Sequence, residues 1–199
     1  MTMTDGYLTL IPGYLLLMPA APAVAWVLAR KADRRWTLLA LLAVIHVTAV
    51  VALTIFPIPI SGQDYYRHTR GMSDDNVVPF ATIVGQLRNP GFNTIRQLLG
   101  NAVALAPLGI YGPGLWRPLR DWRVFAAVAI SFGIGIELAQ YAGSLLEGFS
   151  YRITDVDDAI MNAAGAVVAF FVWRRIEHLP VIERWLPPDS EPVGKAAAG

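Results

Sequence analysis

The sequence predicts an all-α membrane protein, a compact bundle of about five transmembrane helices with a short interfacial helix in the 57–97 outer loop. Its 199 residues are 55% apolar and only 16% charged, whereas an ordinary soluble domain has roughly 25% charged residues. Several apolar stretches approach the roughly 20 residues needed to cross ~30 Å of hydrocarbon. The basic residues concentrate in turns that fall on one predicted side.

Composition excludes several classes of function. The absence of cysteine rules out disulfides, thiolate metal sites and cysteine nucleophiles. The three histidines lack metal-ligand spacing, so we expect neither a metal nor a cofactor. His46 lies in an apolar run and is expected to be packed or hydrogen-bonded. The net charge of +1 gives no indication of a nucleic-acid partner.

The first predicted span covers residues 7–29 and contains three prolines that should bend it. A signal peptide is the competing interpretation. We disfavour it because no basic residue precedes the run, whereas Arg30 and Lys31 follow it directly.

The other four predicted spans differ in how purely apolar they are. The second contains no charge, and Pro107 and Gly109 interrupt the short third one. The fourth is apolar apart from Glu137, Gln140 and a few small polar residues. These four spans cover residues 37–56, about 98–114, 124–146 and about 157–173.

Orientation follows from the positive-inside rule. With five spans, the turns at 30–36 and 115–123 and the C-terminal segment share one side, and they are rich in Arg and Lys. That side is predicted to be cytoplasmic, in a multi-pass protein of the cell membrane with its N-terminus outside. Residues 1–186 are expected to form one domain, followed by a disordered cytoplasmic tail at 187–199 that is rich in Pro, Gly and Ala.

The outer loop at 57–97 contains an apolar run, residues 77–84, that is too short to span. It fits a helix lying on, or dipping into, the outer membrane surface. A loop packed on the outer helix ends explains the same run equally well.

Polar residues inside the fourth span indicate where chemistry could occur. A carboxylate at mid-bilayer costs about 2.5–3.5 kcal/mol, so it normally faces protein or a wet cavity. Glu137 and Gln140 share one helix face with Gly133 and Ser144. At 1.5 Å per residue, Glu137 lies roughly 13 Å and Gln140 roughly 9 Å below the outer helix end.

A matching polar stripe on the fifth span holds Asp155, Asp158 and Asn162. Asn101 lies near the outer end of the third span, and Arg152 lies at the outer mouth beside the two aspartates. These positions predict a cavity that opens toward the outer leaflet.

Structural roles explain part of this set. Thr154 would cap the fifth helix, with Asp157 in the capping-box position. The amides of Asn101, Gln140 and Asn162 would join helices by hydrogen bonds. Capping does not explain Glu137, which lies too deep.

Four sequence blocks between residues 76 and 170 resemble the VanZ-like family of bacterial membrane proteins. They read Asn-x-x-Pro-Phe-x-Thr-Ile from Asn76, Asn followed by Pro-Leu-Gly from Asn101, Ile-Glu-x-x-Gln from Ile136, and Arg-x-x-Asp-x-x-Asp-x-x-x-Asn-x-x-Gly from Arg152. Leu105, Ala169 and Gly133 depart from the residues common in the family, Phe, Gly and Ser. The resemblance implies an envelope location, a link to surface polymers or lipids, and an association with teicoplanin-type glycopeptide resistance.

The favoured hypothesis is an outward-facing site that binds or modifies a lipid-linked phosphate or wall precursor, as a head-group transferase or hydrolase. Candidate catalytic residues are Glu137, Asp155 and Asp158, with buried carboxylates as general acids or bases. Arg152 would hold an anion, and the other candidate ligand contacts are Asn101, Gln140 and Asn162. The alternative is a scaffold that binds lipid or glycopeptide without chemistry. A transporter ranks last, because the cytoplasmic half has no polar path and inverted repeats are not apparent.

Overall fold

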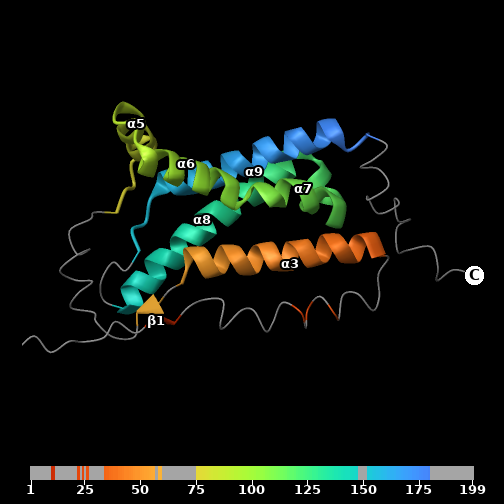
Figure 1. Ribbon diagram of the computed structural model, residues 1–199, viewed down its shortest axis with the longest axis horizontal. Coiled ribbons are helices and arrows are strands. Elements are labelled where there is room, and N and C mark those ends of the chain that lie inside the picture. Colours follow the sequence, from red (N-terminus) through yellow and green to blue (C-terminus); the bar gives the residue numbers. More distant parts are fainter. Residues whose placement is uncertain are drawn as a thin grey trace, which may run out of the picture.

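The computed structural model describes residues 10–11, 22, 24, 26, 34–56, 58–59, 75–147 and 152–179, and most of these residues are helical (Figure 1). Within these ranges, four stretches are long and apolar enough to cross a membrane: Trp36–Thr54, Thr94–Leu115, Trp122–Leu146 and Val156–Ile176. The predicted all-α membrane bundle is therefore confirmed. The predicted first span at 7–29 lies almost wholly outside the described residues, as does the tail at 187–199.

The bundle is assembled from five helices of the described chain and several short elements around them. The helices are α3 (Arg34–Thr54), α6 (Phe92–Ala104), α7 (Ala106–Leu115), α8 (Trp122–Glu147) and α9 (Val156–Ile176). The short elements are helix α5 (Ala81–Arg88), the 3-10 turn η1 (Arg117–Arg120), and strands β1 (Leu10–Ile11) and β2 (Ile58–Pro59), which pair antiparallel.

The third span starts at Thr94, within a helix that begins at Phe92, rather than near residue 98, and it breaks at Leu105. Polar residues in its first turns hid its true start. Pro107 lies in the first turn of α7, where a missing N–H is tolerated. Because Leu108 N–H bonds to Leu105 at the break, the Ala104 carbonyl needs another donor.

His46 supplies that donor from α3. Its Nε2 lies 2.6 Å from the Ala104 carbonyl oxygen, and its Nδ1 lies 2.9 Å from the Tyr111 hydroxyl oxygen. Donation by Nε2–H and acceptance by Nδ1 satisfy both contacts with one neutral tautomer. The prediction that His46 is a hydrogen-bonded residue is confirmed.

The contacts between helices fix their directions. His46 of α3 reaches α7, and the core ring of Phe125 on α8 stacks on Phe170 of α9 with centroids 4.6 Å apart. Helices α3 and α8 run one way, and α6–α7 and α9 run the other. One end of the bundle, the basic end, therefore holds the start of α3 and α8 and the finish of α7 and α9. The opposite end, the polar end, holds α5 and the start of α9.

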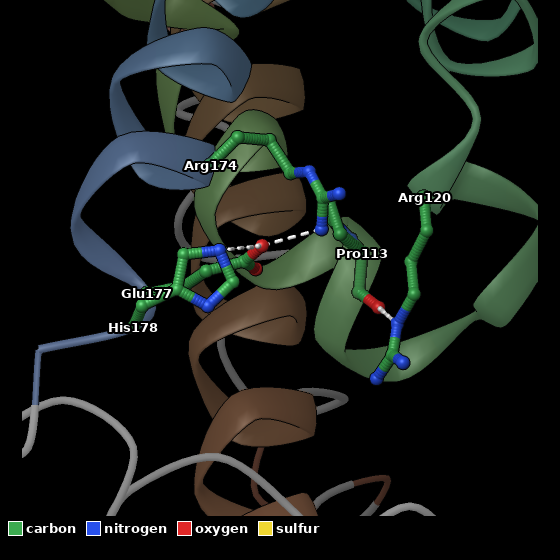
Figure 2. Close-up of polar contacts among 5 residues, drawn as sticks. All are labelled: Pro113, Arg120, Arg174, Glu177 and His178. Carbon is green, nitrogen blue, oxygen red and sulfur yellow. Dashed lines mark hydrogen bonds and ion pairs between the residues drawn. The ribbon is translucent and has the colours of Figure 1, made fainter.

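The basic end gathers most of the described arginines and tryptophans. Figure 2 shows Arg120 donating from Nε to the Pro113 carbonyl oxygen at 3.2 Å, and Arg174 paired with Glu177. A cation beside the last carbonyls of α7 complements the helix dipole. The buried apolar core lies in the same half: Leu105, Leu108, Tyr111, Leu119, Phe125, Ala129, Ala166 and Phe170.

Close helix approach at α9 depends on glycine. A Cβ at Gly165 would overlap the Ala102 carbonyl of α6. A Cβ on Gly109 of α7 or Gly133 of α8 would likewise meet the α9 backbone. Small residues at such contacts let membrane helices pack backbone to backbone.

We predict that Gly165→Ala destabilises the bundle by about 1–3 kcal/mol, since the methyl group must push α6 from α9. Gly100→Ala is the matched control in α6, because nothing lies within 4 Å of its Cβ position. The control should be neutral or slightly stabilising. Thermal unfolding of both variants in detergent measures the difference. Equal melting temperatures for the two variants would contradict the backbone contact.

Candidate functional site

Glu137 and Asp155 meet at the polar end, where α8 passes the start of α9. The Glu137 side chain is 7% exposed, and its Oε2 accepts from the Asp155 backbone N–H at 2.9 Å. Asp155 is the N-cap of α9 and accepts from the Asp157 N–H at 2.9 Å. The prediction that Thr154 caps this helix is wrong. Asp155 has the capping geometry, and Thr154 Oγ1 is buried without a partner in the described chain.

Asn76 fastens the segment before α5 to the start of α9. Its backbone N–H donates to Thr154 and its carbonyl accepts from Val156, both at 2.9 Å. Its Nδ2 donates to Asp155 Oδ1 at 2.8 Å and to Thr82 Oγ1 at 3.0 Å. This one asparagine thus ties α5 to the start of α9.

Asp157 belongs to α9 but forms its hydrogen bonds with the backbone at the start of α5. Its carboxylate accepts from the Phe80 N–H at 2.5 Å and the Ile83 N–H at 3.0 Å, and the side chain is 1% exposed. Phe80 has φ 68°, a left-handed conformation that is uncommon for a residue with a side chain. The expected capping-box role of Asp157 in its own helix is wrong, because the carboxylate instead satisfies the free N–H groups at the start of α5.

Gln140 and Arg152 meet the last carbonyls of α3. Gln140 Nε2 donates to the Thr54 carbonyl oxygen at 3.0 Å, and Arg152 donates to the carbonyls of Leu53, at 3.0 Å, and Phe56. Cations and amide donors at a helix C-terminus satisfy its unpaired carbonyls and complement its dipole. Both residues, predicted as ligand contacts, therefore have a structural task at the polar end.

Asp158 faces α6 and is only partly buried. The Asn101 side chain donates to its carboxylate, and the Gln97 side chain lies near it. Asn162 follows one turn later on the same α9 face, which then reaches α6 again at Gly165. These contacts bring Asn101, Asp158 and Asn162 into one row between α6 and α9.

Asn162 is 3% exposed, and its Oδ1 is buried with no hydrogen-bond partner among the described residues. An unpaired buried polar oxygen costs about 1–3 kcal/mol, so a donor at this position would be stabilising. The row of Asn101, Asp158 and Asn162 therefore contains one hydrogen-bond acceptor that no described residue fills. By contrast, Glu137, Asp155, Gln140 and Arg152 each bond to a backbone group, and Asp155 also accepts from the Asn76 side chain.

The cavity geometry differs from the expectation of a polar cavity around these residues. A cavity of about 340 Å³ lies between α3 and α8, lined by Val51, Thr54, Ile55, Ser131, Phe132, Gly135, Ile136 and Ala139. None of the predicted site residues lines it. In the described part of the chain, no group of three or more His, Cys, Asp or Glu residues could hold a metal ion.

Sequence reasoning missed Gln97 and the clamp formed by Asp157. Gln97 could have been found, because it lies one helical turn before Asn101 on the same face. The Asp157 contact could not, since Phe80 is 77 residues away and capping rules are local.

Comparison with protein families gives one match. The family model described as VanZ/LLP1 matches residues 15–177. Comparisons with curated proteins and with solved structures give no match. The matched range includes every residue of the polar end described above.

We predict that Asp157→Ala releases the start of α5, because the N–H groups of Phe80 and Ile83 lose their acceptor. Each such loss costs about 1–3 kcal/mol, and amide hydrogen exchange at Phe80 and Ile83 should accelerate. The matched control is Asp121→Ala at the basic end, which removes the carboxylate that accepts from the backbone N–H groups of Arg123 and Val124. That control should cost about 1 kcal/mol and leave exchange in α5 unchanged. Unchanged protection of Phe80 and Ile83 in Asp157→Ala would refute the clamp.

Proposed function

The chain belongs to the VanZ/LLP1 family, and from this membership we propose that it binds a lipid-linked phosphate or cell-wall precursor at the polar end of its bundle. In this proposal it is a multi-pass protein of the bacterial cell envelope. The head group of the ligand lies at Asp158, and the lipid part lies in the surrounding bilayer.

The distribution of charge supports an orientation with the polar end outward. Seven described arginines lie at the basic end, near the start of α3, in and after η1, and in the last turn of α9. They are Arg34, Arg35, Arg117, Arg120, Arg123, Arg174 and Arg175. By the positive-inside rule this end faces the cytoplasm. The N-terminus is then outside and the C-terminus inside. The polar end reaches the outer leaflet, where lipid-linked wall precursors carry their head groups.

The observation that carries the proposal is the partnerless Oδ1 of Asn162 one turn below Asp158. A head-group hydroxyl or a protonated phosphate oxygen would supply the missing donor. The Asn101 amide orients the Asp158 carboxylate, which remains partly exposed. Arg152 adds positive charge at this end, which favours a phosphate.

Asp158 is also the best-placed general base in this arrangement. In a hydrolysis, water would attack the phosphorus and give its proton to Asp158. The bond between phosphorus and the leaving oxygen would break, and Asp158 would return the proton to that oxygen. Glu137, which accepts from the Asp155 N–H, positions the start of α9 instead of touching the ligand.

A second candidate, a scaffold that binds lipid or glycopeptide without turnover, is favoured by a different observation. Glu137, Asp155, Gln140 and Arg152 are already bonded to backbone groups. Residues bonded in this way shape a binding site without moving protons. The two candidates differ in whether a product forms.

We predict that purified protein in nanodiscs is thermally stabilised by a polyprenyl-linked phosphate and releases product from it. Asp158→Asn should lower turnover by about 10²-fold or more, as expected for loss of a general base. Glu137→Gln, which keeps an acceptor for the Asp155 N–H, should retain most of it. Stabilisation without product would support the scaffold, and equal turnover in Asp158→Asn would exclude Asp158 as the base.

We further predict that expression in a susceptible bacterial host lowers its teicoplanin sensitivity, as family membership suggests. Asp158→Asn should abolish the effect at equal membrane abundance, whereas Gly100→Ala should preserve it. The minimum inhibitory concentrations of teicoplanin for the three strains and an empty-vector strain provide the measurement. If wild type and empty vector have the same value, the chain has no such role.

A further inference from the structure

Helix α5 has its polar and apolar faces reversed relative to a surface helix of a soluble protein. Thr82 accepts a hydrogen bond from Asn76, and Gln86 donates to Gln97 Oε1 at 2.8 Å, so both side chains face the bundle. Val84 and Leu87 are 41% and 61% exposed. No residue of α5 is buried. In water, the apolar side of this helix would therefore be exposed to the solvent.

The exposed apolar residues form a single stripe. Phe80, Val84 and Leu87 fall within about 60° around the helix axis, and Phe80 is 57% exposed. We call this set the α5 stripe. Asp157 fixes the start of the helix through Phe80 and Ile83, so α5 is held with the stripe outward.

The next helix continues the same reversal. The exposed apolar residues of α6 are Phe92, Ile95, Leu99 and Val103, within about 80° of one another. Its inward side carries Gln97 and Asn101, which bond to Gln86 and Asp158. Most of α6 belongs to the span Thr94–Leu115. Its outward face is therefore the face that a membrane-spanning helix presents to hydrocarbon.

We propose that the α5 stripe is a lipid-contact surface, with α5 embedded in the acyl-chain region of the leaflet at the polar end. Figure 1 shows α5 turned across the direction of α6 at that end of the bundle, as a helix parallel to the membrane plane would lie. Continuity with the outward face of α6 makes lipid the occupant of the stripe. Arg88, at the last position of α5, is long enough to reach the phosphate layer.

The α5 stripe lies on the face of α5 that points away from the bundle, so its contact with lipid does not depend on a ligand at Asp158. An α5 embedded in this way is the membrane-dipping helix, not the loop packed on the helix ends. Lipid acyl chains would then lie on the outer side of α5, and its inner side bonds to Gln97 through Gln86. A lipid head group would then approach the polar end from within the leaflet.

The test uses the absence of native cysteine, which allows single spin labels without background. Val84→Cys and Leu87→Cys variants are labelled in nanodiscs of phosphatidylethanolamine and phosphatidylglycerol. Power-saturation measurements with oxygen, which concentrates in hydrocarbon, and a nickel chelate, which stays in water, report the surroundings. Val103→Cys on α6 is the lipid control, and Arg123→Cys in the first turn of α8, at the basic end, is the water control.

We expect both α5 labels to collide several-fold more with oxygen than with nickel, as Val103→Cys does. Nickel collision as frequent as at Arg123→Cys would show a water-exposed helix and overturn the proposal. Low collision with both reagents would show a protein partner on the stripe and also overturn it. Spin–spin broadening would then identify that partner as a second copy. Two labelled positions keep the result interpretable if one substitution perturbs the helix.

Discussion

Helix ends in a membrane need hydrogen-bond partners that water cannot supply, and this requirement organises the polar end. The last carbonyls of α3 receive Gln140 and Arg152, and the first N–H groups of α5 receive Asp157. Glu137 receives the Asp155 N–H where α9 begins. Each partner comes from a different element than the end it satisfies. The polar residues that are unfavourable in a membrane thus fix the positions of the helices relative to one another.

Because of this requirement, residues of the same type and neighbouring position have different roles. Asp157 and Asp158 are neighbours on α9, yet Asp157 is buried against the start of α5 and Asp158 is partly exposed toward α6. Asp157 satisfies a backbone, and Asp158 lies beside an amide with spare capacity, Asn162. Because adjacent positions on a helix point about 100° apart, neighbouring acids take separate roles. The carboxylate of Asp158 bonds to a side chain of α6, whereas that of Asp157 is used up by the backbone of α5.

Local patterns predicted much of this structure. Apolar length gave the four described spans, and helical spacing placed Asn101, Asp158 and Asn162 among the polar positions at one end. The same rules failed for long-range partners. The capping rule assigned Thr154 because it considers only nearby chain, whereas Asp155 caps α9 with help from Asn76, 79 residues away. The start of α6 was misplaced because its inward polar residues mask an outward apolar stripe.

The position of α9 at the end of the fold has a consequence for biogenesis. It packs on α5, α6, α7 and α8, and it supplies the partners of Asn101 and Glu137. A ribosome releases it last of these helices. Until then, the earlier helices reside in the membrane with polar side chains and glycine faces uncovered. Assembly of the bundle therefore awaits synthesis of its final helix, and an insertase or chaperone that shields α6 and α8 would act in that interval.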